Sequence, residues 1–166
     1  MFCLLTDQLS KLAVRLWINQ ENELQFFGEI FRIVHVENTA GVMGIGIIPM
    51  WVLSILSIGA VVLIAYWLWK MLPSKDWWAL ILPWVLGGAL GNLIDRIMYR
   101  SVTDMFDVDI PDVNLPAFDW WIIHFDGFYL TRWWVFNVAD SYIFLSMILL
   151  IFLSLSGRLD NDVTEK

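Results

Sequence analysis

Three long stretches of this 166-residue chain contain no charged residue. They are bordered by Glu37 and Lys70, by Asp76 and Asp95, and by Asp140 and Arg158. Each is long enough for a helix that crosses a hydrocarbon core of about 30 Å. Hydrophobic residues make up 59% of the chain, more than in an ordinary soluble domain. The sequence therefore predicts a membrane protein.

The first segment is a fourth candidate span although it contains charges. Asp7, Lys11 and Arg15 are spaced i, i+4, i+8 and so follow one stripe of a helix, with apolar residues elsewhere. Because these charges interrupt the apolar run that a cleaved signal peptide needs, we expect the segment to be retained. Cys3 is the single cysteine, so no intrachain disulfide is expected. We predict helices over residues 2–18, 48–71, 77–99 and 136–156.

Basic residues in short loops and tails indicate the orientation. They are Lys70, Lys75, Arg158 and Lys166. The positive-inside rule places all four, and with them both termini, on the cytoplasmic side. The short connection 72–76 predicts that the second and third helices are antiparallel neighbours. Segments 19–47 and 100–135 then lie outside the cytoplasm.

The two outer segments differ in character. Segment 19–47 contains the alternating stretch FFGEIFRIVHVEN, which predicts one or two strands of a small sheet. Segment 100–135 is acidic but contains WWII at 120–123, so we expect it to lie on the membrane surface and cap what is beneath it. Tryptophans near the helix ends, Trp133 and Trp134 among them, are interpreted as interfacial anchors. A net charge of −7 without a basic cluster argues against nucleic acid as a partner.

Two polar islands interrupt the apolar helices, GNLIDR at 91–96 and FNVAD at 136–140. Asn92, Asp95 and Arg96 share one helix face, and Asn137 and Asp140 are spaced i, i+3. Such groups are costly in hydrocarbon unless they are paired or wet, so they are candidates for function. The second island has an equally good local explanation, because Asn137 can cap a helix and Asp140 can favour its positive end.

A third acid, Asp104, follows the third helix by a few residues. If the third and fourth helices are antiparallel, Asp104 and Asp140 can meet. Two carboxylates in a partly dry site share one proton, because both cannot ionise easily. The ionised acid can activate water while the protonated one donates to a substrate carbonyl. Arg96, Asn92 and Asn137 would position a peptide, and this hydrolysis needs no metal or other cofactor.

Other catalytic patterns are weaker. Ser10 and Lys11 are adjacent on one helix, which is a poor arrangement for a nucleophile and its base. His35 and Glu37 lack the helical spacing of a zinc site, and we expect His35 and His124 in loops or strands.

Two alternatives of another class stay open. A small transporter or ion-coupling protein would use the same acids but spread them across the membrane depth, whereas here they gather toward one face. A non-catalytic membrane scaffold would need neither the acids nor the amides at those helix ends.

Five motifs occur in order along the chain: DQLSK (7–11), VENTAG (36–41), GNLIDR (91–96), VTDMF (102–106) and FNVADS (136–141). In this order the chain resembles the bacterial lipoprotein signal peptidases, the signal peptidase II family. The resemblance implies a membrane all-α fold: a four-transmembrane-helix bundle with a small extracytoplasmic β-sheet, here joined by an interfacial cap segment. It implies one integral-membrane domain over 1–166, both termini cytoplasmic and a site near the outer face of the bacterial inner membrane. Because a full span needs about ten more residues before Met1, we expect the chain to start inside the family's first helix.

The resemblance also implies roles for particular residues. It implies that Asp104 and Asp140 are the catalytic pair and that the site is lined by Asn38, Asn92, Arg96 and Asn137. It implies a structural role for Asp7, Lys11 and Asp95. The implied substrate is a diacylglyceryl-modified prolipoprotein, cleaved just before its lipidated cysteine, with membrane phospholipid as the other partner and no cofactor. We expect a monomer. The chain departs from the family at Ala40 and Met43, where glycine and an aromatic residue are usual.

Overall fold

The structure is a computed structural model that describes residues 1–39, 48–74 and 77–156. Several residues named above lie outside these ranges, namely Ala40, Gly41, Met43, Lys75, Arg158 and Lys166.

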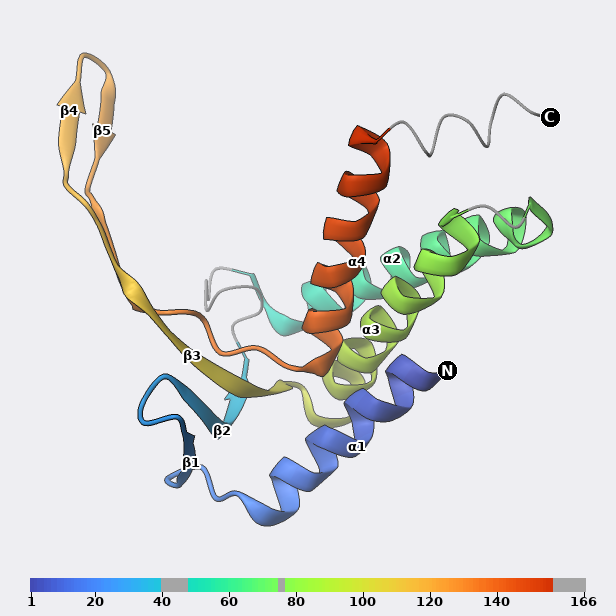
Figure 1. Cartoon of the computed structure of the whole chain (residues 1–166), viewed down its shortest axis with the longest axis horizontal. Coiled ribbons are helices and arrows are strands. Elements are labelled where there is room, and N and C mark those ends of the chain that lie inside the picture. The colour runs from blue at the N-terminus through green and yellow to red at the C-terminus, as the bar shows by residue number, and fades with distance from the viewer. Residues whose placement is uncertain (40–47, 75–76, 157–166) are drawn as a thin grey trace.

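Four α-helices form the body of the described chain (Figure 1). They are α1 (Phe2–Trp17), α2 (Met50–Met71), α3 (Trp77–Tyr99) and α4 (Val138–Leu155). A short 3₁₀ turn, η2 (Leu72–Ser74), follows α2, and α2 then packs against α3 as the short connection predicts. α4 begins at Val138 rather than at 136 because Asn137 is its N-cap.

Three of the described helices, α2, α3 and α4, are long and apolar enough to cross a membrane. No residue of α2 is fully buried within the chain, and the side of α2 that faces away from α3 is apolar and exposed. α1 has 16 residues and carries Asp7, Lys11 and Arg15, and so does not qualify by length and composition. The structure therefore shows three candidate spans where the sequence predicts four.

A four-stranded antiparallel sheet lies beside the helices, in the order β1-β2-β3-β6. Its strands are β1 (Glu23–Phe26), β2 (Phe31–Asn38), β3 (Val102–Leu115) and β6 (Phe128–Arg132). The strands predicted in 19–47 are confirmed as β1 and β2. β3 starts three residues after α3 ends, and its first half pairs with β2, with Asp104 opposite Val36. A small apolar cluster of Val14, Ile18 and Met105 holds this start of β3 against α1.

The segment expected to cap the site has a different structure. The second half of β3 pairs with β6, and β4 (Phe118–Trp120) pairs with β5 (Ile123–Phe125) in a two-stranded sheet. Together they form an arm that leads away from the helices (Figure 1). The segment leaves the site because strand pairing, with a register irregularity between Asp109 and Val113, carries the chain outward. It returns at residues 133–136.

The contact between α1 and α3 is ionic and fully buried. Lys11 Nζ lies 2.9 Å from Asp7 Oδ2 and 3.2 Å from Asp95 Oδ2, and all three side chains have 0% exposure. Arg15 adds a contact of 3.0 Å to Asp95. Asp7 also accepts a hydrogen bond of 2.9 Å from the backbone N–H of Ala139, at the start of α4. One ion cluster therefore fixes three helix ends relative to each other.

Small residues allow these helices to approach closely. Three glycines are buried on α3, namely Gly87, Gly88 and Gly91. A Cβ at Gly87 would lie 2.9 Å from Cys3 Cβ, and one at Gly88 would lie 2.6 Å from the carbonyl oxygen of Ala139. A Cβ at Gly91 would overlap the Asp7 carboxylate. These three glycines therefore allow α3 to pack closely against α1 and α4.

Candidate active site

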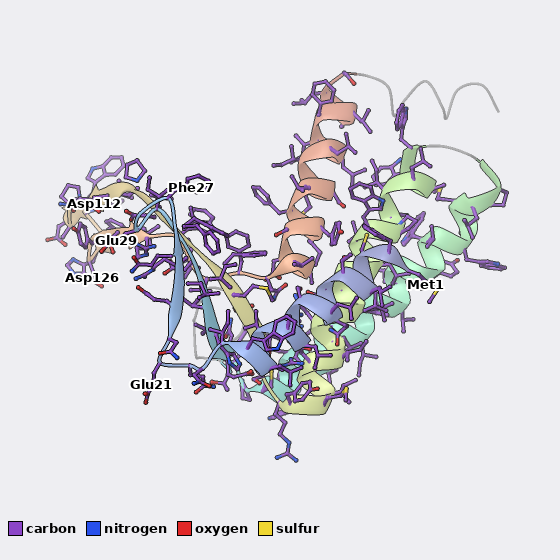
Figure 2. All side chains as sticks on the ribbon, turned by 60° about the horizontal axis from the view of Figure 1, so that its bottom comes forward. Met1, Glu21, Phe27, Glu29, Asp112 and Asp126 are labelled. Carbon is purple, nitrogen blue, oxygen red and sulfur yellow. The ribbon has the colours of Figure 1, made fainter. Side chains whose placement is uncertain are left out.

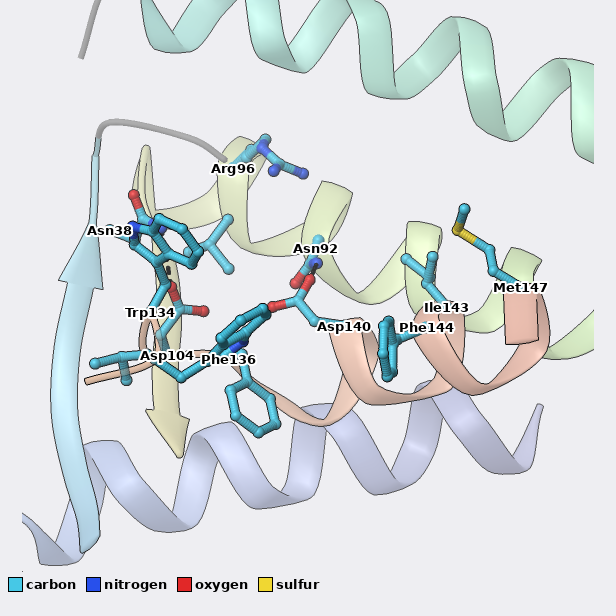
Figure 3. Close-up of a pocket in the computed structure, with 13 residues that line it drawn as sticks. Asn38, Asn92, Arg96, Asp104, Trp134, Phe136, Asp140, Ile143, Phe144 and Met147 are labelled. Carbon is cyan, nitrogen blue, oxygen red and sulfur yellow. Dashed lines mark hydrogen bonds between the residues drawn. The ribbon is translucent and has the colours of Figure 1, made fainter. Parts of the chain in front are cut away.

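A cavity of about 320 Å³ lies where the end of α3, the start of β3 and the start of α4 meet (Figure 3). Its polar lining comes from five residues that the sequence singles out: Asn38, Asn92, Arg96, Asp104 and Asp140. Its apolar lining comes from residues 133–136 and from one side of α4. Asp7, Lys11 and Asp95 are not in the lining; they form the buried ion cluster behind it.

Asp104 is held by two amides. It is 3% exposed, on the part of β3 that is buried against β2 and α1. Asn38 Nδ2 donates to Asp104 Oδ2 at 2.9 Å, and Asn137 Nδ2 donates to Asp104 Oδ1 at 2.7 Å. Asn38 comes from β2, so strand pairing brings it to Asp104.

Asp140 is held by the start of its own helix and by α3. The backbone N–H of Asn137 donates to Asp140 Oδ2 at 3.2 Å, and the Asn137 side chain accepts from the Asp140 backbone N–H at 3.0 Å. This reciprocal pair is a capping box. Asn92 Nδ2 donates to Asp140 Oδ1 at 2.8 Å. The FNVAD island therefore caps α4, as its local explanation predicts, and Asp140 also lines the cavity.

Asn137 connects the two acids. It is fully buried, and its side-chain Nδ2 contacts Asp104 while its backbone nitrogen contacts Asp140. The same Nδ2 donates to Asn92 Oδ1 at 3.1 Å, and that oxygen also accepts from Lys11 Nζ at 2.8 Å. Asn137 therefore links the two acids, and Figure 3 shows their carboxylates pointing toward one another.

The surroundings of Asp104 favour its protonated form. Burial raises the pKa of the Asp104 carboxyl to about 6. The hydrogen bonds from Asn38 and Asn137 lower the pKa, but by less than burial raises it. The neighbouring Asp140 acts in the same direction as burial, because its negative charge disfavours a second one. Asp104 can therefore exchange a proton near neutral pH.

Arg96 brings a cation to the cavity. Its Nη1 donates to Ser57 Oγ on α2 at 3.3 Å. Its Nε is buried, and no group among residues 1–39, 48–74 and 77–156 accepts from it. A buried donor without an acceptor is costly. Arg96 therefore lines the cavity with a buried N–H that has no acceptor in the described part of the chain.

The neighbouring polar groups have structural partners. Glu37 accepts from Ser101, from Thr103 Oγ1 at 3.1 Å and from His35 Nε2 at 3.0 Å. His35 and His124 lie in strands β2 and β5. Within the described part of the chain, no group of three His, Cys, Asp or Glu side chains is placed to hold a metal ion.

The apolar wall of the cavity was missed in the sequence. Trp133 and Trp134, interpreted as interfacial anchors, line the cavity together with Phe136 and Phe144. A second, apolar cavity of about 420 Å³ adjoins it and shares Trp133, Phe136, Asp140 and Phe144. One sequence feature indicates this role: Trp133 and Trp134 directly precede the FNVAD island.

This arrangement is suited to general acid–base chemistry. One carboxyl exchanges a proton near neutral pH, a second lies beside it, and amides hold both in place. A water molecule between the two acids could be deprotonated by one while the other protonates a substrate oxygen.

Comparisons with known proteins identify the family of this chain. The family described as signal peptidase (SPase) II matches residues 1–156. A lipoprotein signal peptidase of Rhodococcus jostii is 35% identical over 164 residues, which are 98% of this chain and 73% of that protein. One of Borrelia duttonii is 31% identical over 150 residues, with 87% and 80% covered. A solved structure described as a bacterial membrane enzyme has the same fold, with a TM-score of 0.70 at 21% identity over 96% of this chain and 86% of that one. The chain therefore belongs to the signal peptidase II family.

Proposed function

We propose that this protein is a membrane-embedded aspartic endopeptidase that removes the signal peptide from diacylglyceryl-modified prolipoproteins, cutting before the lipidated cysteine. Membership of the signal peptidase II family and relatives named lipoprotein signal peptidase support the substrate class. The observation that carries the aspartic mechanism is the contact of Asn137 with both Asp104 and Asp140. The transporter alternative has no support in these relatives.

In the proposed reaction, the two acids share one proton and hold one water molecule. The ionised carboxylate takes a proton from water as the water attacks the scissile carbonyl carbon, and the protonated acid donates to the carbonyl oxygen. The acid that took the water proton then gives it to the amine nitrogen as the carbon–nitrogen bond breaks, and the other carboxylate takes a proton from a hydroxyl of the tetrahedral intermediate as the carbonyl re-forms. Strongly coupled acids titrate as a pair, so the shared proton belongs to Asp104 and Asp140 together and not to either residue alone. Arg96, Asn38 and Asn92 position the peptide.

The apolar cavities suit a lipidated substrate. Ile143, Phe144 and Met147 of α4 line the first cavity, and Leu145 lines the second. Phe144 and Leu145 are exposed on a helix that can span a bilayer, with 61% and 54% of their surface accessible. A substrate can therefore enter from the lipid side, with acyl chains or the apolar part of its signal peptide against these side chains.

The proposal includes α1 as a fourth span of one integral-membrane domain. Its charged stripe is buried against α3, while apolar side chains cover the other side. These are Leu5, Leu9, Leu12 and Leu16. A helix with this division can lie in lipid, because its charges are paired inside the protein. We further propose a monomer in the bacterial inner membrane, with both termini cytoplasmic and the cavity toward the outer face.

The test is cleavage of matched substrates. Purified protein in phospholipid nanodiscs is given a precursor with a diacylglyceryl cysteine and the same precursor without the lipid, and the products are identified by mass spectrometry. We expect cleavage before the cysteine of the lipidated precursor only. Cleavage of neither precursor, or equal cleavage of both, would refute the proposed substrate class.

A further inference from the structure

The outer part of the stem of the arm, residues 113–115 paired with 128–130, has one apolar and one polar face. Antiparallel pairing sets Val113 opposite Leu130 and Leu115 opposite Phe128. The intervening pair is Asn114 and Tyr129, which therefore lies on the other face. Tyr129 hydroxyl donates to the Asp112 carboxylate at 3.3 Å on that face. The stem is thus an amphipathic ribbon that is exposed on both faces.

The hairpin at the end of the arm, β4 and β5, repeats this division. Phe118 lies opposite Phe125, with ring centroids 5.2 Å apart, and Trp120 shares their face. The alternate pair is Asp119 and His124, which are in ionic contact. Asp126 lies 3.0 Å from the other ring nitrogen of His124. The carboxylates of the hairpin are therefore gathered away from its aromatic face.

The two-residue turn of this hairpin projects large apolar side chains. Trp121 is 95% exposed and Ile122 is 82% exposed, beside Trp120 at 73%. Trp121 has φ = 53°, a left-handed conformation that normally selects glycine or asparagine. The end of the hairpin therefore presents large apolar side chains to its surroundings.

The apolar face of the arm is continuous with the lipid-facing side of α4. The Phe128 ring lies 6.3 Å from that of Trp134, which lies 5.3 Å from that of Trp133. Trp133 shares the apolar cavity with Phe144 and Leu145 of α4. Figure 2 shows Asp112 and Asp126 on the arm, far from the helices.

We propose that the arm is a membrane anchor whose aromatic hairpin, with Trp120, Trp121 and Ile122 at its end, inserts into the lipid interface beside the cavity. Tryptophan favours the headgroup level of a bilayer, and the paired acids on the opposite face stay in water. Because Asp112, Asp119 and Asp126 repel an anionic surface, the lipid it takes is zwitterionic. This anchor does not depend on the proposed peptidase activity.

The test measures the depth of a fluorophore on the full chain in phosphatidylcholine vesicles. Cys3→Ala removes the native thiol, and a small fluorophore is attached at Ile122→Cys or, as a matched control on the polar face, at Asp126→Cys. A nitroxide on the lipids should quench the label at 122 more strongly than the label at 126, and iodide in water should give the reverse order. Adding Trp120→Ser and Trp121→Ser to the 122-labelled protein should abolish the lipid quenching.

Equal iodide quenching at 122 and 126, with no lipid quenching at either, would overturn the anchor. Shielding of the label at 122 that rises with protein concentration, and not with lipid, would also overturn it, because the occupant would then be a second copy of the chain. Lipid quenching that persists after both tryptophans are replaced would contradict their role.

Discussion

At the scale of single residues, Asn137 has three tasks that depend on its side-chain amide and its backbone. It caps α4, donates to Asp104 and donates to Asn92. An aspartate at this position could cap the helix equally well, but it could not donate to Asp104 when ionised. The amide therefore allows a third polar group to lie between two acids without adding a third negative charge.

The raised pKa of Asp104 makes stability depend on pH in a direction opposite to that of a salt-bridged acid. Its pKa is 3.8 ordinarily and about 6 in the folded chain, so the folded state binds more protons between these values. The wild type should therefore lose up to about 3 kcal/mol of unfolding free energy relative to Asp104→Asn as pH rises from below the unfolded pKa to well above the folded one. Thermal unfolding in a neutral detergent at several pH values measures this. A stability difference that does not change with pH would contradict the assignment.

At the scale of elements, glycine contacts set the distance between α3 and α4. In Gly88→Ala the new Cβ would lie 2.6 Å from the Ala139 carbonyl oxygen and 2.9 Å from Ile143 Cγ1, so the helices must separate. We expect a loss of about 1–3 kcal/mol in unfolding free energy. Gly59→Ala on α2 is the matched control, because nothing lies within 4 Å of its Cβ position. It should be neutral or stabilising by up to about 1 kcal/mol.

Chemical denaturation of both variants in the same micelles compares the two effects. Equal stability of the two proteins would mean that α3 and α4 are not in close contact at Gly88.

The helices and β2 could be predicted from the sequence, but the arm could not. Charge-free stretches indicate helices because the bilayer excludes charge, and alternation around Ile33 indicates a strand. The same alternation was present where Val108 and Ile110 alternate with Asp107 and Asp109. It was overlooked because the acids suggested a surface segment and because Pro111 is unusual within a strand. The structure accommodates Pro111 in the irregular register between Asp109 and Val113.

At the scale of the whole molecule, the site is assembled from distant segments. Asn38, Asn92, Asp104 and Asn137 come from β2, α3, β3 and the start of α4. Motifs and helix direction predict that Asp104 and Asp140 lie near each other, and both line one cavity. The bridge through Asn137 and the aromatic wall at Trp133 depend on how β3 pairs and how the chain returns from the arm, which no local pattern contains.

The central claim is that Asp104 and Asp140 act together in one cleavage reaction. The direct measurement is the initial rate of cleavage of a diacylglyceryl precursor in nanodiscs by the wild type, Asp104→Asn, Asp140→Asn and the double variant. Asp107→Asn is the matched control, a buried acid on the same strand that pairs with Arg32 and Arg132 instead. Each catalytic variant should lose at least about a thousandfold in rate, and the double variant no more than the worse single one, because residues that act as a unit are not additive. Folded Asp107→Asn should retain most of its activity. Cleavage by Asp104→Asn or Asp140→Asn at the rate of Asp107→Asn would contradict the account.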